Sequence, residues 1–137
     1  MPQNTSLPIL VVDDNRTMVR ITTELLRQVG YLNVDGAADG SQALAMAAKK
    51  TYDLVISDWN MAEVSGLDLL RALKPAAGDQ RPRFIMATAE SKTDRIVQAR
   101  VAGADAYIVK PFTAQTLRVK IESLFPRQPA PESVSGQ

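Results

Sequence analysis

The sequence Ile9-Leu10-Val11-Val12-Asp13-Asp14 joins a run of apolar residues directly to a pair of carboxylates. The apolar run is too short for a buried helix, and its β-branched residues favour a strand that is covered on both faces. Similar runs recur along the chain, namely Leu54-Val55-Ile56, Phe84-Ile85-Met86, Tyr107-Ile108-Val109 and the weaker Asn33-Val34-Asp35-Gly36-Ala37. The pattern therefore predicts five short strands.

Segments with helical spacing lie between these runs. Met18, Ile21, Leu25 and Val29 repeat at intervals of three or four residues, which predicts an amphipathic helix that ends at Gly30. Four more helices are predicted: from the capping box at Asp39 to Lys49, along Leu67, Leu70 and Leu73 up to Pro75, from Ser91 to Ala102, and along Leu117 to Phe125 before Pro126. This alternation predicts an α/β fold, a doubly wound five-stranded parallel sheet with helices on both faces.

The chain has 137 residues, the size of one ordinary domain. We expect a flexible N-terminus over residues 1–6, a folded domain over residues 7–125 and a disordered tail over residues 126–137. Lys and Arg total 16 against 15 Asp and Glu, so we expect no binding to nucleic acid or to anionic membranes. The sequence shows no signal peptide and no stretch near the ~20 apolar residues of a membrane span, which predicts a cytoplasmic protein.

Cysteine and histidine are both absent. Their absence excludes disulfides, thiolate nucleophiles, Ser-His catalysis and metal sites that are built on Cys or His. Any phosphate or metal chemistry must therefore use carboxylates, lysine or hydroxyl groups.

Polar residues stand where the predicted strands end. Asp13 and Asp14 follow the first run, and Asp58, Thr88 and Lys110 follow the runs that begin at positions 54, 84 and 107. Each has an ordinary explanation by itself, such as an acid that caps the first helix, a helix-entry hydroxyl or a surface lysine. Because the carboxyl ends of parallel strands meet at one edge, where open α/β sheets bind ligands, we expect these side chains to lie together.

Three carboxylates held close together repel one another. Each pair costs about 4 kcal/mol at ~4 Å and an effective dielectric constant of ~20, which indicates that a cation binds there. Oxygen ligands without nitrogen or sulfur suit Mg²⁺, and Lys110 and Thr88 would supply a positive charge and a hydroxyl to phosphoryl oxygens. A carboxylate is then the expected phosphate acceptor, which would form an aspartyl phosphate.

These residues and their spacings resemble the receiver domains of two-component response regulators, and most closely the single-domain chemotaxis members. The resemblance covers Leu7 to Phe125, and the motifs that carry it are Val11-Val12-Asp13-Asp14, Asp58-Trp59-Asn60-Met61, Thr88-Ala89-Glu90 and Tyr107-Ile108-Val109-Lys110-Pro111-Phe112-Thr113. It implies a flavodoxin-like sheet with the strand order 2-1-3-4-5.

The resemblance also implies roles for the acids. Asp58 would be the phosphoacceptor. Mg²⁺ would be held by Asp14 directly, by Asp13 through water, by Asp58, and by the backbone carbonyl of Asn60. Asn60 and Glu90 would tune the lifetime of the phosphate.

The remaining implied roles concern the last two strands. Lys110 would contact the phosphoryl group, and its bond to Pro111 would be cis. Thr88 would move toward the phosphate and Tyr107 would turn into the space it leaves. This pair would reshape the surface formed by the fourth helix, the fifth strand and the fifth helix. One departure is Ala62, where the family usually has Pro, so we expect a more mobile loop after the phosphoacceptor.

The resemblance implies a stand-alone, monomeric switch. A histidine kinase would phosphorylate Asp58, and the altered surface would bind a downstream protein such as a flagellar motor switch component. The chain would not be an enzyme beyond its own phosphoryl transfer and autodephosphorylation. One alternative is a phosphorelay intermediate that passes phosphate to a histidine phosphotransfer protein. A more remote one is a small Mg²⁺-dependent aspartyl-phosphate phosphatase, although Asn15 stands where such enzymes need a second Asp.

Overall fold

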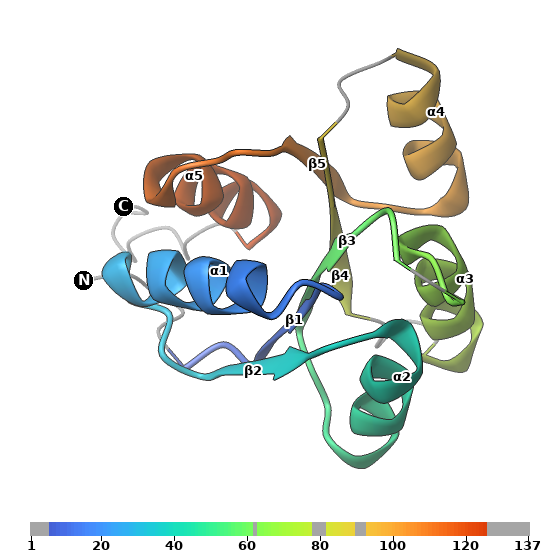
Figure 1. The fold of residues 1–137 in the computed structure, drawn as a ribbon, viewed down its shortest axis with the longest axis horizontal. Helices are drawn as coiled ribbons and strands as arrows, with labels where there is room; N and C mark the ends of the chain where they lie inside the picture. Colours follow the sequence, from blue (N-terminus) through green and yellow to red (C-terminus); the bar gives the residue numbers. More distant parts are fainter. Residues whose placement is uncertain (1–5, 62, 78–81, 90–92, 126–137) are drawn as a thin grey trace, which may run out of the picture.

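The computed structural model describes residues 6–61, 63–77, 82–89 and 93–125. Its sheet has five parallel strands in the order β2-β1-β3-β4-β5, which confirms the predicted fold class and strand order (Figure 1). The strands are β1 (Ile9–Val12), β2 (Val34–Ala37), β3 (Leu54–Asp58), β4 (Arg83–Thr88) and β5 (Ala106–Val109). The helices are α1 (Arg16–Gln28), α2 (Gly40–Lys49), α3 (Gly66–Ala77), α4 (Thr93–Ala102) and α5 (Ala114–Leu124).

Helices cover both faces of the sheet. Alternate residues of β1 enter different cores: Leu10 packs in the core shared with α2, α3 and α4, whereas Ile9 packs in the core shared with α1 and α5. Figure 1 shows the same division, with α1 and α5 on one side of the sheet and the other helices on the opposite side. Because both faces are covered, β1 and β3 are buried along their whole length, which explains their continuous apolar runs.

The predicted helix boundaries at Gly30, Asp39, Lys49 and Ala102 are confirmed, whereas the one at Pro75 is wrong. Gly30, at a φ of 99°, follows the end of α1, and the Asp39 side chain caps α2 by accepting a hydrogen bond from the Gln42 backbone N–H at 2.7 Å. However, α3 continues past Pro75 and ends at Ala77. A proline removes only one helical hydrogen bond, and near the end of a helix that loss stays local. Alanine, the strongest helix former, follows it.

Several sequence-based expectations fall outside the described residues. These concern the flexible start before Ser6, the loop at Ala62, the position of Glu90, the helix start at Ser91 and the tail from residue 126. Within the described ranges, none of the helices has the length and apolar character needed to cross a membrane.

Candidate functional site

The parallel register brings the predicted site residues to one edge of the sheet. Asp13 directly follows β1, and Asp58 ends β3, where it pairs with Ala87 of β4. Thr88 ends β4, and Lys110 directly follows β5. Residues far apart in the sequence therefore meet where the strands end.

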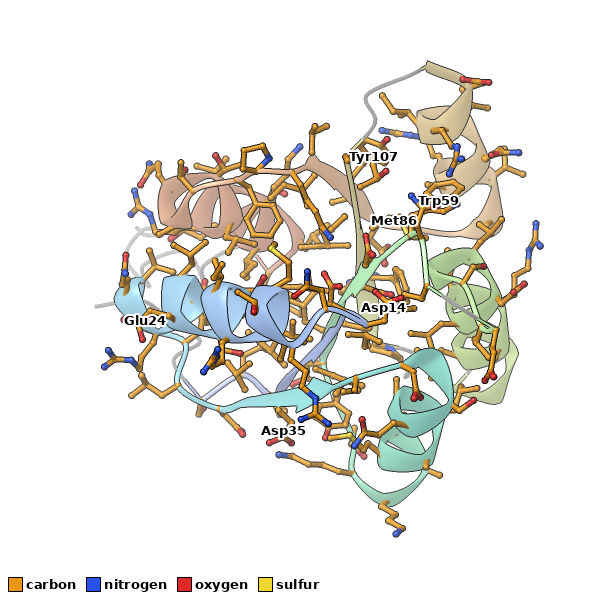
Figure 2. All side chains as sticks on the ribbon, in the orientation of Figure 1. Asp14, Glu24, Asp35, Trp59, Met86 and Tyr107 are labelled. Carbon is orange, nitrogen blue, oxygen red and sulfur yellow. The ribbon has the colours of Figure 1, made fainter. Side chains whose placement is uncertain are left out.

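Three carboxylates form an acid cluster at this edge, made of Asp13, Asp14 and Asp58. One carboxylate oxygen from each lies within 4.8 Å of the others. Asp13 and Asp58 are buried, at 5% and 9% exposure, whereas Asp14 is exposed to solvent (Figure 2). An all-oxygen set with one open side could hold a hard divalent cation.

Lys110 is ion-paired with both buried acids. Its Nζ atom lies 2.9 Å from Oδ2 of Asp13 and 3.0 Å from Oδ1 of Asp58. The repulsion within the acid cluster is therefore partly offset by the chain itself. Three carboxylates against one ammonium group still leave an excess of negative charge at the site.

The electrostatics of the site depend strongly on burial. Burial raises the pKa of the Asp58 carboxyl, Lys110 opposes this rise, and repulsion from Asp13 and Asp14 adds to it. Burial alone would lower the pKa of Lys110, but its hydrogen bonds to Asp13 and Asp58 outweigh burial and raise it. Lys110 thus keeps its positive charge, while the pKa of Asp58 lies above its ordinary value.

Asn15 caps α1, so neither Asp13 nor Asp14 is used as the helix cap. Asn15 is the N-cap, and its side-chain oxygen accepts hydrogen bonds from the backbone N–H groups of Thr17 and Met18 at 3.0 and 3.3 Å. The Asn15 backbone N–H also donates to Oδ1 of Asp13 at 3.0 Å, which orients that carboxylate. The explanation that an acid caps the first helix is therefore wrong, because Asn15 takes that position.

Thr88 and Tyr107 occupy different depths beside the acid cluster. Thr88 is fully buried at the end of β4, and its backbone carbonyl accepts a hydrogen bond from Lys110 N–H at 2.7 Å. Tyr107 is half-buried in β5, one strand away, where it pairs with Met86 (Figure 2). The two residues thus stand on adjacent strands, and Tyr107 lies level with Met86, two residues before Thr88.

The other predicted site residues lie in the connections. Asn60 is exposed, two residues after Asp58, and the peptide bond between Lys110 and Pro111 is cis. Glu90 lies outside the described residues.

Two features of the site are not predicted from the sequence. A Cβ atom on Gly66 would meet the backbone carbonyl of Asp58, so the first residue of α3 packs tightly under the acid cluster. The guanidinium group of Arg95 lies over the Trp59 ring, 4.8 Å from its centroid. A glycine at a helix start is a usable sequence signal, but nothing in the sequence pairs Arg95 with Trp59.

Comparisons with known proteins agree with this arrangement. The profile of the response regulator receiver domain matches residues 9–122. The chemotaxis protein CheY of Pseudomonas aeruginosa is 46% identical over 121 residues, which cover 88% of this chain and 98% of the relative. Chemotaxis protein CheY-3 of Vibrio cholerae is 44% identical over 124 residues, covering 90% and 95%. Among solved structures, the Vibrio cholerae chemotaxis protein CheY4 superposes with a TM-score of 0.80 at 30% identity, covering 86% of this chain and 98% of that one.

Proposed function

The chain belongs to the response regulator receiver domain family, and we propose that it is a single-domain signalling switch with Asp58 as its phosphoacceptor. The observation that carries this proposal is the position of Asp58, which lies in the acid cluster and 3.0 Å from Lys110. A carboxylate with a raised pKa, a neighbouring ammonium group and an all-oxygen cation site suit phosphoryl transfer to a carboxylate.

The chemical step is a transfer between two side chains. A carboxylate oxygen of Asp58 attacks the phosphorus of a phosphohistidine on a histidine kinase, and the phosphorus–nitrogen bond breaks. The electron pair of that bond stays on the imidazole ring, which then takes up a proton. Lys110 stabilises the negative charge on the transferred phosphoryl oxygens, because its ammonium group already lies beside the attacking carboxylate.

The acid cluster fits Mg²⁺. Its donor atoms are all carboxylate oxygens, Asp14 is open to solvent, and the negative excess beyond Lys110 requires compensation. Asp13, Asp14, Asp58 and the backbone carbonyl of Asn60 would hold the ion, with Asp13 acting through water. When bound, Mg²⁺ would neutralise charge on the acids and on the phosphoryl oxygens.

The output of the switch is a change in the surface made by α4, β5 and α5. Thr88 moves toward the phosphoryl group and Tyr107 turns inward behind it. Apolar side chains are exposed on this surface, with Val97 and Val101 on α4, Val109 on β5 and Val119 on α5. Because the curated relatives are named chemotaxis proteins, we assign the downstream partner to the flagellar motor switch.

The test is the intact mass of the protein after incubation with acetyl phosphate and Mg²⁺. We expect the wild type to gain one phosphoryl group, and Asp58→Asn to gain none. Asp53→Asn is the matched control, since Asp53 is exposed just before β3, at the opposite end of the strand from Asp58. The proposal would be contradicted if Asp58→Asn gained a phosphoryl group. It would also be contradicted if the wild type gained none from acetyl phosphate and none from a phosphorylated kinase.

A further inference from the structure

Helix α4 contacts the residue next to the phosphoacceptor. Trp59 directly follows Asp58 and is only 7% exposed, and the Arg95 guanidinium carbon lies 4.8 Å from the centroid of its ring. This separation is in the range of cation–π stacking. Figure 2 shows Trp59 extending from the end of β3 toward α4. The stack therefore joins the phosphorylation site to the first turn of α4.

Two backbone hydrogen bonds hold Trp59 beside the site. Its backbone N–H donates to the carbonyl of Ala87 at 2.9 Å, which extends the pairing of β3 with β4 by one residue. Its own carbonyl accepts a hydrogen bond from Gly66 N–H at 2.9 Å, which ties it to the start of α3. The Trp59 backbone is therefore held between β4 and the start of α3, directly after Asp58, in the position where its ring meets Arg95.

Little else in α4 is buried. Among the side chains of residues 94–102, Ala99 alone is buried. A cavity of about 20 Å³ lies between α4 and β5, where Ile96, Ala99 and Tyr107 form part of its lining. Because alanine is a small side chain, its burial contributes little free energy to the packing of α4. The stack on Trp59 is thus a substantial part of what positions α4.

Resting on the function proposed above, we propose that Arg95 is a positioning residue for the switch. Its stack on Trp59 holds α4 in the unphosphorylated position, and the stack is lost when α4 moves. An interaction present in only one of two states shifts the equilibrium toward that state, so Arg95 opposes activation. Since Val97 and Val101 are 52% and 79% exposed on the same helix, the stack also controls how this apolar surface is presented.

The first test is amide hydrogen exchange in the unphosphorylated protein, which needs no phosphorylation chemistry. We expect Arg95→Gln to speed exchange in α4 while leaving α5 unchanged, and Arg95→Lys to lie closer to wild type because it keeps the charge. Arg100→Gln removes the same charge from an exposed position later in α4 and is the matched control. The proposal would be overturned if the exchange rate of α4 in Arg95→Gln equalled that of wild type. It would also be overturned if Arg100→Gln raised this rate as much as Arg95→Gln.

The second test is a titration with beryllofluoride and Mg²⁺, read through Trp59 emission. If the stack opposes activation, Arg95→Gln should bind this phosphoryl analogue between about two- and thirty-fold more tightly, the range that cation–π energies imply. Unchanged or weaker binding by Arg95→Gln, with normal binding by wild type, would overturn the inference about Arg95 alone. Absence of binding by wild type would instead contradict the function proposed for the site, and the exchange experiment would still decide the positioning role.

Discussion

Lys110 and Asp58 form an ion pair of 3.0 Å between the ends of β5 and β3, with β4 between them in the sheet. The side chain of Lys110 is 19% exposed and that of Asp58 is 10% exposed, so the pair is largely shielded from water. The same ammonium group also contacts Asp13 at 2.9 Å. Lys110 therefore offsets part of the repulsion between the carboxylates of the acid cluster.

Replacing Lys110 should show how much the uncompensated carboxylates lower the free energy of unfolding. Lys110→Ala leaves two buried carboxylates without their partner, which should lower the free energy of unfolding at pH 7 by about 2–3 kcal/mol. Without Lys110, which opposes the rise in the pKa of Asp58, this pKa rises further, so Asp58 protonates on acidification and the loss should shrink toward pH 5. Urea unfolding at the two pH values measures this, with Lys49→Ala, an exposed lysine, as control. An equal loss at both pH values would contradict the electrostatic explanation.

Removing the charge of Asp58 should have the opposite effect. The pKa of Asp58 is raised in the folded protein, chiefly by burial, so the folded state binds its proton more tightly than the unfolded state. The carboxylate thus destabilises the fold at neutral pH, and this penalty disappears as pH falls through the raised pKa toward the unfolded value. Asp58→Asn should therefore stabilise the metal-free protein at pH 7 by an amount on the order of 1 kcal/mol. The advantage over wild type should diminish at pH 4, and a lower denaturation midpoint for the mutant at pH 7 would exclude the explanation.

The sheet could be predicted because its signals are local. A run such as Ile9 to Val12 is apolar on both faces only when both faces are covered, and the carboxyl ends of parallel strands must share one edge. Those two facts place Asp13, Asp58 and Lys110 together without any structure. The end of α3 was less predictable, since the effect of Pro75 depends on how much helix remains beyond it.

The contacts within the site could not be predicted from the same signals. Whether Asp13, Asp14 or Asn15 caps α1 depends on backbone angles at the helix start, because both Asp and Asn favour that position. The pairing of Lys110 with two acids depends on side-chain reach across β4. The stack of Arg95 on Trp59 depends on how α4 packs against the connection between β3 and α3. No periodicity in the sequence predicts this packing.

Trp59 offers a direct measurement of cation binding. It is the single tryptophan and adjoins Asp58, so its emission should change saturably with Mg²⁺ when the acid cluster takes up the ion. Asp14→Asn should raise the Mg²⁺ midpoint at least about tenfold, since even residues surrounding metal ligands cost 10- to 100-fold when changed. Asp53→Asn, at constant ionic strength, should titrate like wild type. Identical midpoints for all three proteins would exclude the acid cluster as the Mg²⁺ site.

Gly66 should be as sensitive to substitution as the acids, although it carries no side chain. A Cβ atom there would meet the backbone carbonyl of Asp58 and would lie 2.8 Å from Sδ of Met86, and only the methionine can move away cheaply. Gly66→Ala should therefore lower the free energy of unfolding by about 2 kcal/mol and also weaken Mg²⁺ binding, because the Asp58 backbone must shift. Ser65→Ala is the control, because it removes the Ser65 hydroxyl that accepts a hydrogen bond from Asp68 N–H at 3.1 Å. It should lower the free energy of unfolding by about 1 kcal/mol without changing the Mg²⁺ midpoint. If Gly66→Ala behaves like Ser65→Ala in the Mg²⁺ titration, the start of α3 does not fix the position of Asp58.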